Sequence, residues 1–333
     1  MRPWLGRDSM QKGGVLMEDI LINHYDEMTK MYRAVGLKLE YLDGFRAEFE
    51  RYKQQHFPRV SVLSHALAEG WIHDTKNQSK VMLGKRVQAM KRLGMYQRSL
   101  GKNAYVPDYC IKQDPAPEPY LFNDSQLLEF FALADSIPPD PRSPHREVLF
   151  PIIFRLMYCC GLRSSEACCL EVSHVDLSSG TLSIYQSKGH KDRVVYMSRD
   201  VTDLCRRFHM YYSAVMPGRK YFFQPGLEKK HYTALDVGNT FRRILQQSSF
   251  FPELGKKPTP HGLRHLFAVK NLQSCLERND DFNNWIQYLG QYMGHSLLRD
   301  TLYYVHMTIQ LFPVYQDKLM RLAEGIGVAY VEE

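Results

Sequence analysis

The chain carries, near its end, the stretch Met293-Gly-His-Ser-Leu-Leu-Arg-Asp-Thr-Leu-Tyr-Tyr304-Val-His306. A Gly-His pair, which contains His295, precedes the adjacent tyrosines Tyr303 and Tyr304 and a further histidine. Buried or half-buried tyrosines are common in ordinary protein cores and interfaces, so this stretch by itself indicates no chemistry. Its interpretation depends on three other stretches of basic and histidine residues that precede it along the chain.

One of these stretches is Thr259-Pro-His-Gly-Leu-Arg-His265, which predicts the start of a helix. His261 and Arg264 are three residues apart, so they should face the same side of that helix. Pro260 suits a first helical turn, where its missing N–H is not needed. A histidine and an arginine that point together at a helix N-terminus make a phosphate pocket. Contacts that merely cap the helix are the alternative.

The remaining two stretches contain an arginine and a lysine. Arg163 lies in Gly161-Leu-Arg-Ser-Ser-Glu166, at a predicted helix start that follows a long buried helix. A helix N-terminus binds anions, so Arg163 is a candidate phosphate ligand. A surface arginine that pairs with Glu166 is the alternative. Lys188 lies in the turn Ser187-Lys-Gly-His-Lys191, where its flexible stem lets it swing, although most hairpin lysines are merely solvated.

The turn that holds Lys188 belongs to a predicted sheet. Alternating β-branched and aromatic residues over 181–186 predict a strand, and 174–177 and 192–197 predict its two antiparallel neighbours. Elsewhere apolar residues recur at helical spacing. The fold class is therefore mainly α with a small antiparallel β-sheet. The principal helices are expected over residues 18–53, 62–72, 79 to beyond 93, 146–160 and 309–323, with another capped by Asn123 or Asp124.

Prolines divide the chain into two parts. Residues 113–119 contain three prolines, which make a stiff and extended linker. A length of 333 residues also suits two domains. We therefore expect a flexible N-terminal segment over 1–16, a helical domain over 17–112 and a second domain over 120–333 that ends in a C-terminal helix.

Basic residues crowd the end of the first domain. Between Lys76 and Lys112 the only acidic residue is Asp108, whereas a solvated helix face usually mixes both signs. The whole chain has a formal charge of +7, a mild basic excess. Phosphate binding is therefore favoured over a merely solvated face. The DNA-binding candidates are Lys76, Lys80, Lys85, Arg86, Lys91, Arg92, Arg98 and Lys102.

Composition argues against several other classes of protein. The seven cysteines form no C-x-x-C pair, so the spacing of a zinc ribbon is missing, and their odd number favours a reducing compartment. No stretch approaches the ~18 continuous apolar residues of a membrane span, and the first residues lack the apolar run of a secretory signal. We therefore expect a cytoplasmic protein without contact to a membrane.

Taken in order, the four stretches resemble the active-site signature of the tyrosine recombinase or phage integrase family, from about residue 119 to 315. The resemblance implies an N-terminal helical core-binding domain and an α+β catalytic domain, which close as a clamp on double-stranded DNA. It selects Lys188 over Lys191 and Tyr304 over Tyr303. The catalytic residues that it implies are Arg163, Lys188, His261, Arg264, His295 and the nucleophile Tyr304.

The resemblance also implies a reaction. A guanidinium binds two phosphate oxygens and stays charged, so Arg163 and Arg264 suit a phosphodiester. His261 and His295 add hydrogen bonds, and His261 can take the proton of the tyrosine. Lys188 would protonate the 5′ oxygen as it leaves, and the resulting 3′-phosphotyrosine conserves bond energy for rejoining. No metal and no other cofactor is expected, because the arginines replace the metal ion.

The implied partners are double-stranded DNA and further copies of the chain. A dimer on each site and a tetramer on paired sites are expected, together with an accessory directionality protein. Two placements of the final helix over 309–323 remain open, one on its own domain and one on a neighbouring protomer.

Two departures from the family pattern concern the last stretches. Met293 stands where leucine is common, and residues 276–284 lengthen the gap before the Gly-His pair. That gap and the N-terminal domain favour an integrase or tyrosine-type transposase of a bacterial or phage mobile element over a chromosome-dimer resolvase of the Xer type.

A type IB topoisomerase, a DNA-binding protein without catalysis and a zinc-dependent nuclease are further alternatives. The Gly-His pair with its later Tyr-x-His, together with the small N-terminal helical domain, argues against the topoisomerase. The complete catalytic set argues against a protein without catalysis, and the missing ligand spacing argues against the nuclease.

Overall fold

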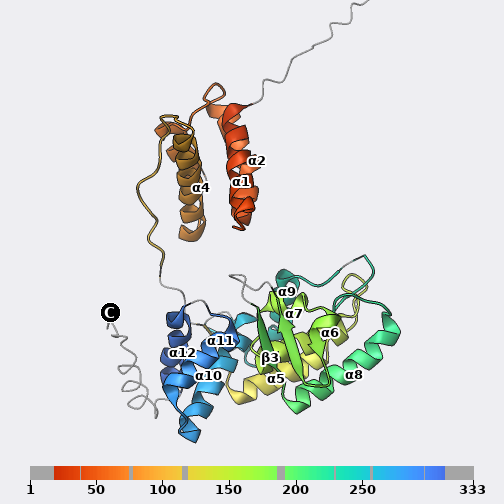
Figure 1. The fold of residues 1–333 in the computed structure, drawn as a ribbon. Coiled ribbons are helices and arrows are strands. Elements are labelled where there is room, and N and C mark those ends of the chain that lie inside the picture. The colour runs from red at the N-terminus through yellow and green to blue at the C-terminus, as the bar shows by residue number, and fades with distance from the viewer. Residues whose placement is uncertain are drawn as a thin grey trace, which may run out of the picture. The chain divides into compact units, whose positions relative to one another are not determined.

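The computed structural model describes residues 19–37, 39–74, 78–114, 119–185, 192–228, 230–255, 258–295 and 297–311. The chain divides into two compact units, Met1–Pro117 and Glu118–Glu333 (Figure 1). Each unit has a hydrophobic core of its own. The division falls inside residues 113–119, which the sequence predicts to be a linker. The flexible segment predicted over 1–16 lies outside the described residues.

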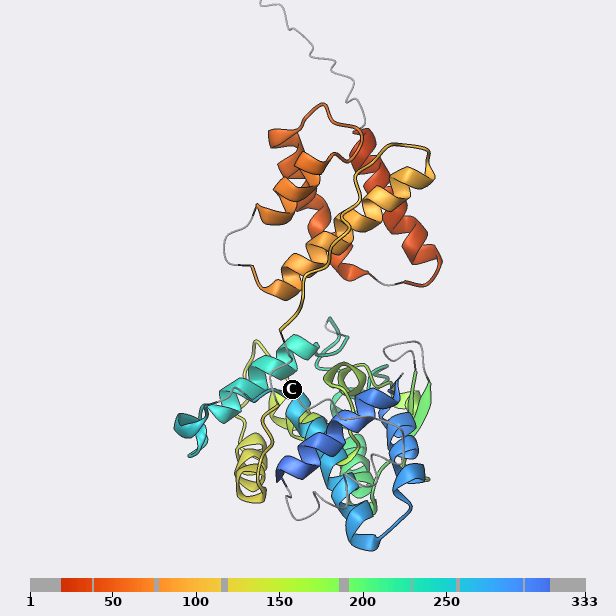
Figure 2. The ribbon, with the colours of Figure 1, turned by 90° about the vertical axis from the view of Figure 1, so that its left-hand side faces the viewer.

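The described part of the first unit is a bundle of helices (Figure 2). Helix α4 packs against α1 and α3, and α2 packs against α1, α3 and α4. The aromatic side chains of Tyr25, Phe49 and Trp71 are fully buried between them. The bounds of these helices are α1 (Ile20–Ala34), α2 (Glu40–His56), α3 (His65–His73) and α4 (Lys80–Ser99).

The single helix predicted over 18–53 is wrong, because the structure has two helices there. Helix α1 ends at Ala34, and Gly36 then adopts a left-handed conformation (φ +81°) that other residues rarely adopt. Helix α2 starts only at Glu40. Apolar spacing continues across this break, so periodicity alone does not reveal it. The predicted start of the third helix is confirmed, since the Ser79 hydroxyl caps α4 by accepting the N–H of Met82.

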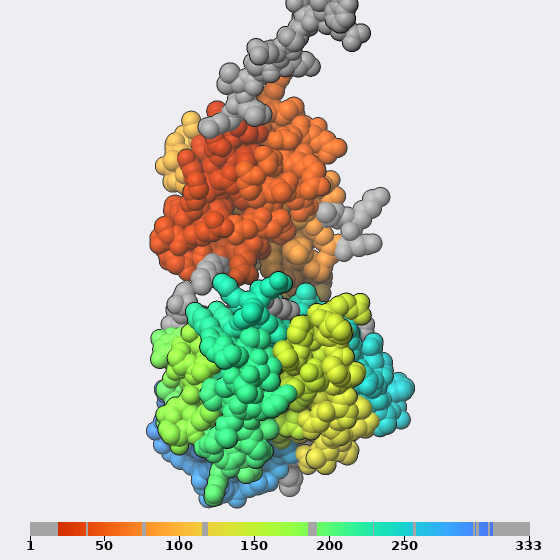
Figure 3. Space-filling view, turned by 90° about the vertical axis from the view of Figure 1, so that its right-hand side faces the viewer, coloured from red at the N-terminus to blue at the C-terminus, as the bar shows by residue number. Residues whose placement is uncertain are grey.

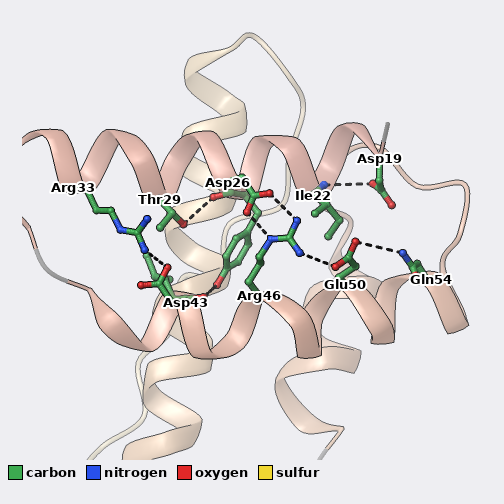
Figure 4. A network of polar contacts seen from close by, with 11 residues as sticks. Asp19, Ile22, Asp26, Thr29, Arg33, Asp43, Arg46, Glu50 and Gln54 are labelled. Atoms are coloured by element: carbon green, nitrogen blue, oxygen red, sulfur yellow. Dashed lines mark hydrogen bonds and ion pairs between the residues drawn. The ribbon is translucent and has the colours of Figure 1, made fainter. Parts of the chain in front are cut away.

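Ion pairs join α1 to α2 (Figure 4). Arg46 donates to the two carboxylate oxygens of Asp26 at 2.7 and 2.8 Å, and to Glu50 at 2.7 Å. These residues are half-buried and remain in contact with solvent, so each pair contributes on the order of 1 kcal/mol. Lys53 is buried, and its Nζ lies 2.5 Å from the carboxylate of Asp19, the N-cap of α1. Loss of either partner would leave a buried charge uncompensated, so this pair fixes the two helices most firmly.

The described part of the second unit is built around α6, most of whose residues are buried. Helices α5, α7, α8 and α10 all pack against it, and α8 forms a ridge along one face (Figure 3). Asn123 caps α5 by accepting the N–H of Gln126 at 2.9 Å. The helices are α5 (Asp124–Asp135), α6 (Arg146–Cys159), α7 (Ser164–Cys168), α8 (Arg199–Val215), α9 (Ala234–Leu245), α10 (His261–Arg278), α11 (Phe282–Met293) and α12 (Leu298–Leu311).

A small antiparallel sheet belongs to the second unit. Its strands β1 (Val175–Asp176), β2 (Thr181–Ile184) and β3 (Arg193–Tyr196) lie in the order β1-β2-β3. Leu182 and Val195 pair across β2 and β3 and are both buried. Each strand is shorter than predicted, and residues 186–191 lie outside the described part of the chain. The predicted fold class, mainly α with a small antiparallel sheet, is confirmed.

Helix α12 is the last described element. It continues through Ile309 to Leu311, so a separate helix does not begin at 309 as predicted. Residues 312–323 of that predicted helix lie outside the described residues. Within the described ranges, no helix is both long enough and apolar enough to span a bilayer.

Candidate active site

Three of the four stretches singled out in the sequence meet where α10 packs against α6, α11 and α12 (Figure 1). Gly161 turns the chain after α6 at φ +62°, where an added Cβ would lie 2.6 Å from the ring of Phe267. Arg163 follows at the start of α7. Gly294, at φ +67°, ends α11 in the same left-handed conformation. Both turns that lead into the site therefore require glycine.

The guanidinium groups of Arg163 and Arg264 converge on the carboxylate of Glu166. Arg163 Nη1 lies 2.7 Å from Glu166 Oε1, and Arg264 Nη1 lies 3.8 Å from Glu166 Oε2. Arg264 is only 1% exposed and donates to the backbone carbonyls of Gly161 and Met293. These contacts hold both guanidinium groups between the first and the last stretches of the signature.

Glu166 also binds a third arginine, Arg193 of β3. Its two carboxylate oxygens accept hydrogen bonds from the two Nη atoms of Arg193 at 3.0 and 2.7 Å. Burial alone would raise the pKa of Glu166, but the hydrogen bonds and charges of Arg193 and Arg163 outweigh it and lower the pKa to about 2. Three positive charges therefore surround one negative charge. The pairing of Arg163 with Glu166 is real, but it lies inside a cationic cluster rather than on a solvated surface.

Tyr304 lies inside this cluster, and Tyr303 lies at its edge. Tyr304 is 2% exposed, whereas Tyr303 is 38% exposed. The Oη of Tyr304 lies 3.2 Å from Nδ1 of His265, and its ring stacks on the ring of His295 with centroids 5.8 Å apart. Burial raises the pKa of Tyr304, and the charges of the two predicted arginines oppose that rise. Of the two tyrosines, Tyr304 is therefore the one beside the arginines.

Two neutral histidines border the tyrosine. Burial, assisted by neighbouring positive charge, lowers the pKa of His295 to about 4 and that of His265 to about 3. Nδ1 of His295 lies 2.8 Å from the hydroxyl of buried Thr301, which fixes the plane of its ring. Both rings are therefore uncharged at neutral pH and can act as hydrogen-bond donors and acceptors.

His261 lies at the start of a helix, as predicted, but it is more exposed than Arg264. It lies at the first residue of α10 and is exposed, whereas Arg264 is buried. The ring of His261 meets the ring of His265 edge-on, with centroids 4.5 Å apart. His265 thus contacts both His261 and Tyr304, so the two histidines connect the tyrosine hydroxyl to the surface of α10.

Residues 143–310 match the sequence model of the phage integrase family. The chain belongs to the phage integrase family. The integrase/recombinase y4qK of Sinorhizobium fredii is 30% identical over 264 residues, which cover 68% of this chain and 79% of that protein. Tyrosine recombinase XerD of Neisseria meningitidis is 26% identical over 306 residues, covering 87% and 94%. Alignments with several other curated integrases and tyrosine recombinases span between 47% and 64% of those proteins.

The fold of this integrase family member is also that of a solved recombinase. The integrase of transposon Tn1549, in complex with transposon right-end DNA, is similar with a TM-score of 0.58 and 16% identity, over 85% of this chain and 94% of that one. Such a likeness shows the fold alone. Together with the family match, it confirms the class predicted from the sequence, a tyrosine-type recombinase.

The basic run of this integrase family member needs one correction. Arg86 is 1% exposed, pairs with Glu48, donates to the carbonyl of Trp71 and lies 4.3 Å from the centroid of the Trp71 ring. It therefore belongs to the core of the first unit, and its prediction as a phosphate ligand is wrong. The exposed members of the run are Lys80, Lys85, Arg98 and Lys102, and the half-buried ones are Lys91 and Arg92.

Two predicted residues of this family member, Lys188 and Lys76, lie outside the described residues. Conversely, Arg193 and His265 are not among the residues predicted from the sequence. His265 follows Arg264 directly within a quoted stretch, so its position beside the motif was an available signal. Arg193 stands in a predicted strand, where a charged residue facing the protein interior is unusual. Neither signal says which distant residue the side chain would meet.

Proposed function

We propose that this protein cuts and rejoins double-stranded DNA at specific sites through a covalent bond between Tyr304 and a 3′ phosphate. One observation carries the proposal. Tyr304 is buried against His265 and His295, beside the arginine cluster that contains Arg163 and Arg264. A tyrosine in an ordinary core has no need for such an excess of positive charge around it.

The arginines supply the phosphate site. Each guanidinium has five N–H donors, and Arg264 gives two of its nitrogens to backbone carbonyls. Burial, followed by the charge of Arg163, lowers the pKa of Arg264 to about 10, so the group remains charged at neutral pH. Positive charge that is already fixed in place stabilises the additional negative charge of the pentacovalent transition state.

In the proposed strand-cutting step, one bond to phosphorus forms and another breaks. The Oη of Tyr304 bonds to phosphorus, the bond from phosphorus to the 5′ oxygen breaks, and that oxygen takes a proton from Lys188. The tyrosine proton leaves through His265, which contacts the hydroxyl, and His261 beside it. Deprotonation of a free tyrosine at pH 7 costs about 4 kcal/mol, and the arginine charges reduce that cost. Attack by a 5′ hydroxyl on the phosphotyrosine reverses the step and needs no ATP.

Tyr304 and Arg264 are both buried, with only 2% and 1% of their surfaces exposed. A phosphodiester reaches the arginines only if α12, which carries the tyrosine, shifts away from α10. We infer that binding of the correct site opens the cluster, and that phosphate contacts elsewhere on the protein supply the free energy. Cleavage would then be coupled to recognition of the whole site.

DNA is the proposed partner of both units. The integrase of Tn1549 was solved with DNA, and the first unit of this chain presents Lys80, Lys85 and Arg98 at its surface. Salt-dependent contacts to phosphates would hold the duplex, while base contacts set the sequence. We further propose a dimer on each site, a tetramer on paired sites, an accessory directionality protein and a cytoplasmic location.

The proposed role is integration, excision or transposition of a bacterial or phage mobile element. The similarity to integrase/recombinase y4qK and to the fold of the Tn1549 integrase favours it. Resolution of chromosome dimers is the second candidate, and the match to XerD along 87% of this chain favours that role. The two differ in substrate, since the first requires the ends of an element and the second a site in the chromosome.

A suicide substrate tests the proposed reaction. A duplex that carries the candidate site and a nick just beyond the scissile phosphate loses its short 5′ fragment and traps the covalent intermediate. Wild type and Tyr303→Phe should form a protein–DNA adduct in EDTA on a denaturing gel, and Tyr304→Phe should form none. If wild type binds the site but forms no adduct, the chain is a DNA-binding protein without catalysis.

A further inference from the structure

We propose that Arg193 is a positioning residue, which neutralises Glu166 and thereby leaves Arg163 and Arg264 available for the DNA phosphate. This inference rests on the function proposed above. It assigns a task to the one arginine of the cluster that lies outside the four stretches of the signature.

The bond between Arg193 and Glu166 is a two-pronged ion pair. Nη1 of Arg193 lies 3.0 Å from Oε1 of Glu166, and Nη2 lies 2.7 Å from Oε2. The side chains are only 7% and 6% exposed. Each carboxylate oxygen therefore has its own donor on Arg193, in the geometry in which a guanidinium binds a carboxylate most strongly. Arg163 and Arg264 make no such two-pronged side-chain contact, since one Nη of each approaches the carboxylate, at 2.7 and 3.8 Å.

The pair between Arg193 and Glu166 determines how much of the positive charge of the other two arginines remains to bind a phosphate. With Arg193 present, three positive charges face one carboxylate, and an excess of two remains for a phosphate. Without it, the excess falls to one, and Glu166 keeps as hydrogen-bond donors only the side chain of Arg163 on Oε1 and the backbone N–H of Arg163 on Oε2, at 2.7 and 2.9 Å. A buried carboxylate that loses its partner is costly, so it would compete directly with the DNA for the side chains of Arg163 and Arg264.

A further contact extends the role of Arg193 to the Gly-His pair. Nε of Arg193 donates to the carbonyl of Tyr292 at 2.7 Å, at the end of α11. An added Cβ on Gly294 would lie 3.2 Å from Nη1 of Arg193. Arg193 therefore packs against the turn that leads to His295, as well as against Glu166. It joins β3, the start of α7 and the end of α11 through one side chain.

Lysine cannot reproduce this set of contacts. An ammonium group is a single point, whereas the guanidinium serves two carboxylate oxygens and a backbone carbonyl at once. Arg193→Lys preserves the positive charge and loses the two-pronged contact with the carboxylate. It therefore separates the contribution of charge from that of geometry.

The test measures the rate of adduct formation on the nicked substrate, at saturating DNA, for three variants of the cluster and one control. Arg193→Gln should slow adduct formation by about 10²–10³-fold, the range seen when one fixed donor of a charge-stabilising site is lost. Its affinity for the DNA should change less than the rate. Arg193→Lys should lie between Arg193→Gln and wild type. The double variant Arg193→Gln/Glu166→Gln should be at least about tenfold faster than Arg193→Gln, because it removes the competing carboxylate as well.

Arg155→Gln is the matched control. Arg155 forms a similar two-pronged pair with Asp135, at 2.7 and 2.7 Å, and links α6 to α5 outside the cluster. The variant Arg155→Gln should form the adduct at the wild-type rate. Melting temperatures of all variants show which of them fold, and Arg193→Lys provides the rate if Arg193→Gln does not.

Three results would overturn the inference: wild-type cleavage by Arg193→Gln, wild-type cleavage by Arg193→Lys, or a double variant no faster than Arg193→Gln. In each of them wild type still forms its adduct, so the proposed function would stand. Absence of the adduct with wild type on DNA that it binds would instead remove the proposed function.

Discussion

The phenolic oxygen of Tyr304 lies 3.2 Å from Nδ1 of His265, a residue that the family signature did not single out. Burial, and then the charges of His261, Arg264 and His295, lower the pKa of His265 to about 3. The ring is therefore neutral at pH 7, and a neutral imidazole has one nitrogen that accepts a hydrogen bond. With its proton on Nε2, His265 accepts the hydroxyl hydrogen of Tyr304 and fixes the direction of the nucleophile's oxygen.

We therefore expect His265→Leu to slow adduct formation by about 10–100-fold at saturating DNA, since a buried hydroxyl without its partner loses about 1–3 kcal/mol. His265→Asn keeps a polar atom close to the position of Nδ1 and should be clearly faster than His265→Leu. Single-turnover cleavage of the nicked duplex measures both rates. Equal rates for the two variants would show that His265 acts through packing and not through its hydrogen bond.

The two half-buried histidines of the site, His265 and His295, also predict how stability depends on pH. The pKa of His265 is lowered to about 3 and that of His295 to about 4, so the unfolded chain takes up these protons first as the pH falls. Their contribution to stability is fully present above pH 6.5 and is lost as the pH falls through the lowered values. The melting temperature of the second unit should therefore drop between pH 6.5 and pH 4.

A double variant, His265→Asn/His295→Asn, should have a flatter pH dependence over that range. His56→Asn, an exposed residue of the first unit, is the control and should leave the dependence unchanged. Calorimetric scans at several pH values check both expectations. A double variant that loses stability on acidification as steeply as wild type would contradict the assignment.

The fold could be predicted where the local sequence carries its own signal. Helix α4 begins just after Ser79, Asn123 caps α5, and α6 covers Arg146–Cys159, as the sequence indicates. The break after α1 was missed because the apolar spacing runs on through Gly36. A residue in the left-handed backbone conformation changes the direction of the chain. The spacing of apolar residues does not show such a change.

The site could be predicted only through residues whose order along the chain carries the family signature. Arg193 and His265 reach their partners across 27 and 39 residues of sequence, by contacts that depend on how helices and sheet pack. Arg86 was misassigned for the opposite reason. A run of basic residues describes composition, whereas the neighbouring aromatic rings and Glu48 decide that this side chain turns inward.

The correction for Arg86 leads to a matched pair of variants. Arg86→Ala should destabilise the first unit, because it leaves a cavity beside Trp71 and removes the partner of Glu48. Lys85→Ala, one residue earlier and exposed, should leave stability unchanged and weaken DNA binding. Thermal melts and binding titrations at several salt concentrations separate the two effects.

For Lys85→Ala, the slope of log affinity against log salt should fall by about one, the value for one phosphate contact. If Arg86→Ala melts like wild type and changes only the salt slope, Arg86 is a DNA ligand after all. If Lys85→Ala binds like wild type at every salt concentration, Lys85 belongs to a solvated face.

Gly294 offers a test of how tightly the turn before His295 must be built. Any other residue at φ +67° costs about 1–2 kcal/mol, and a Cβ here would also lie 3.2 Å from Nη1 of Arg193. Gly218 has nearly the same conformation, φ +69°, with no atom within 4 Å of an added Cβ. Gly294→Ala and Gly218→Ala should therefore lose similar stability from backbone strain, but only Gly294→Ala should slow adduct formation. Equal cleavage rates for the two variants would show that the site tolerates displacement of Arg193 and that strain is the whole effect.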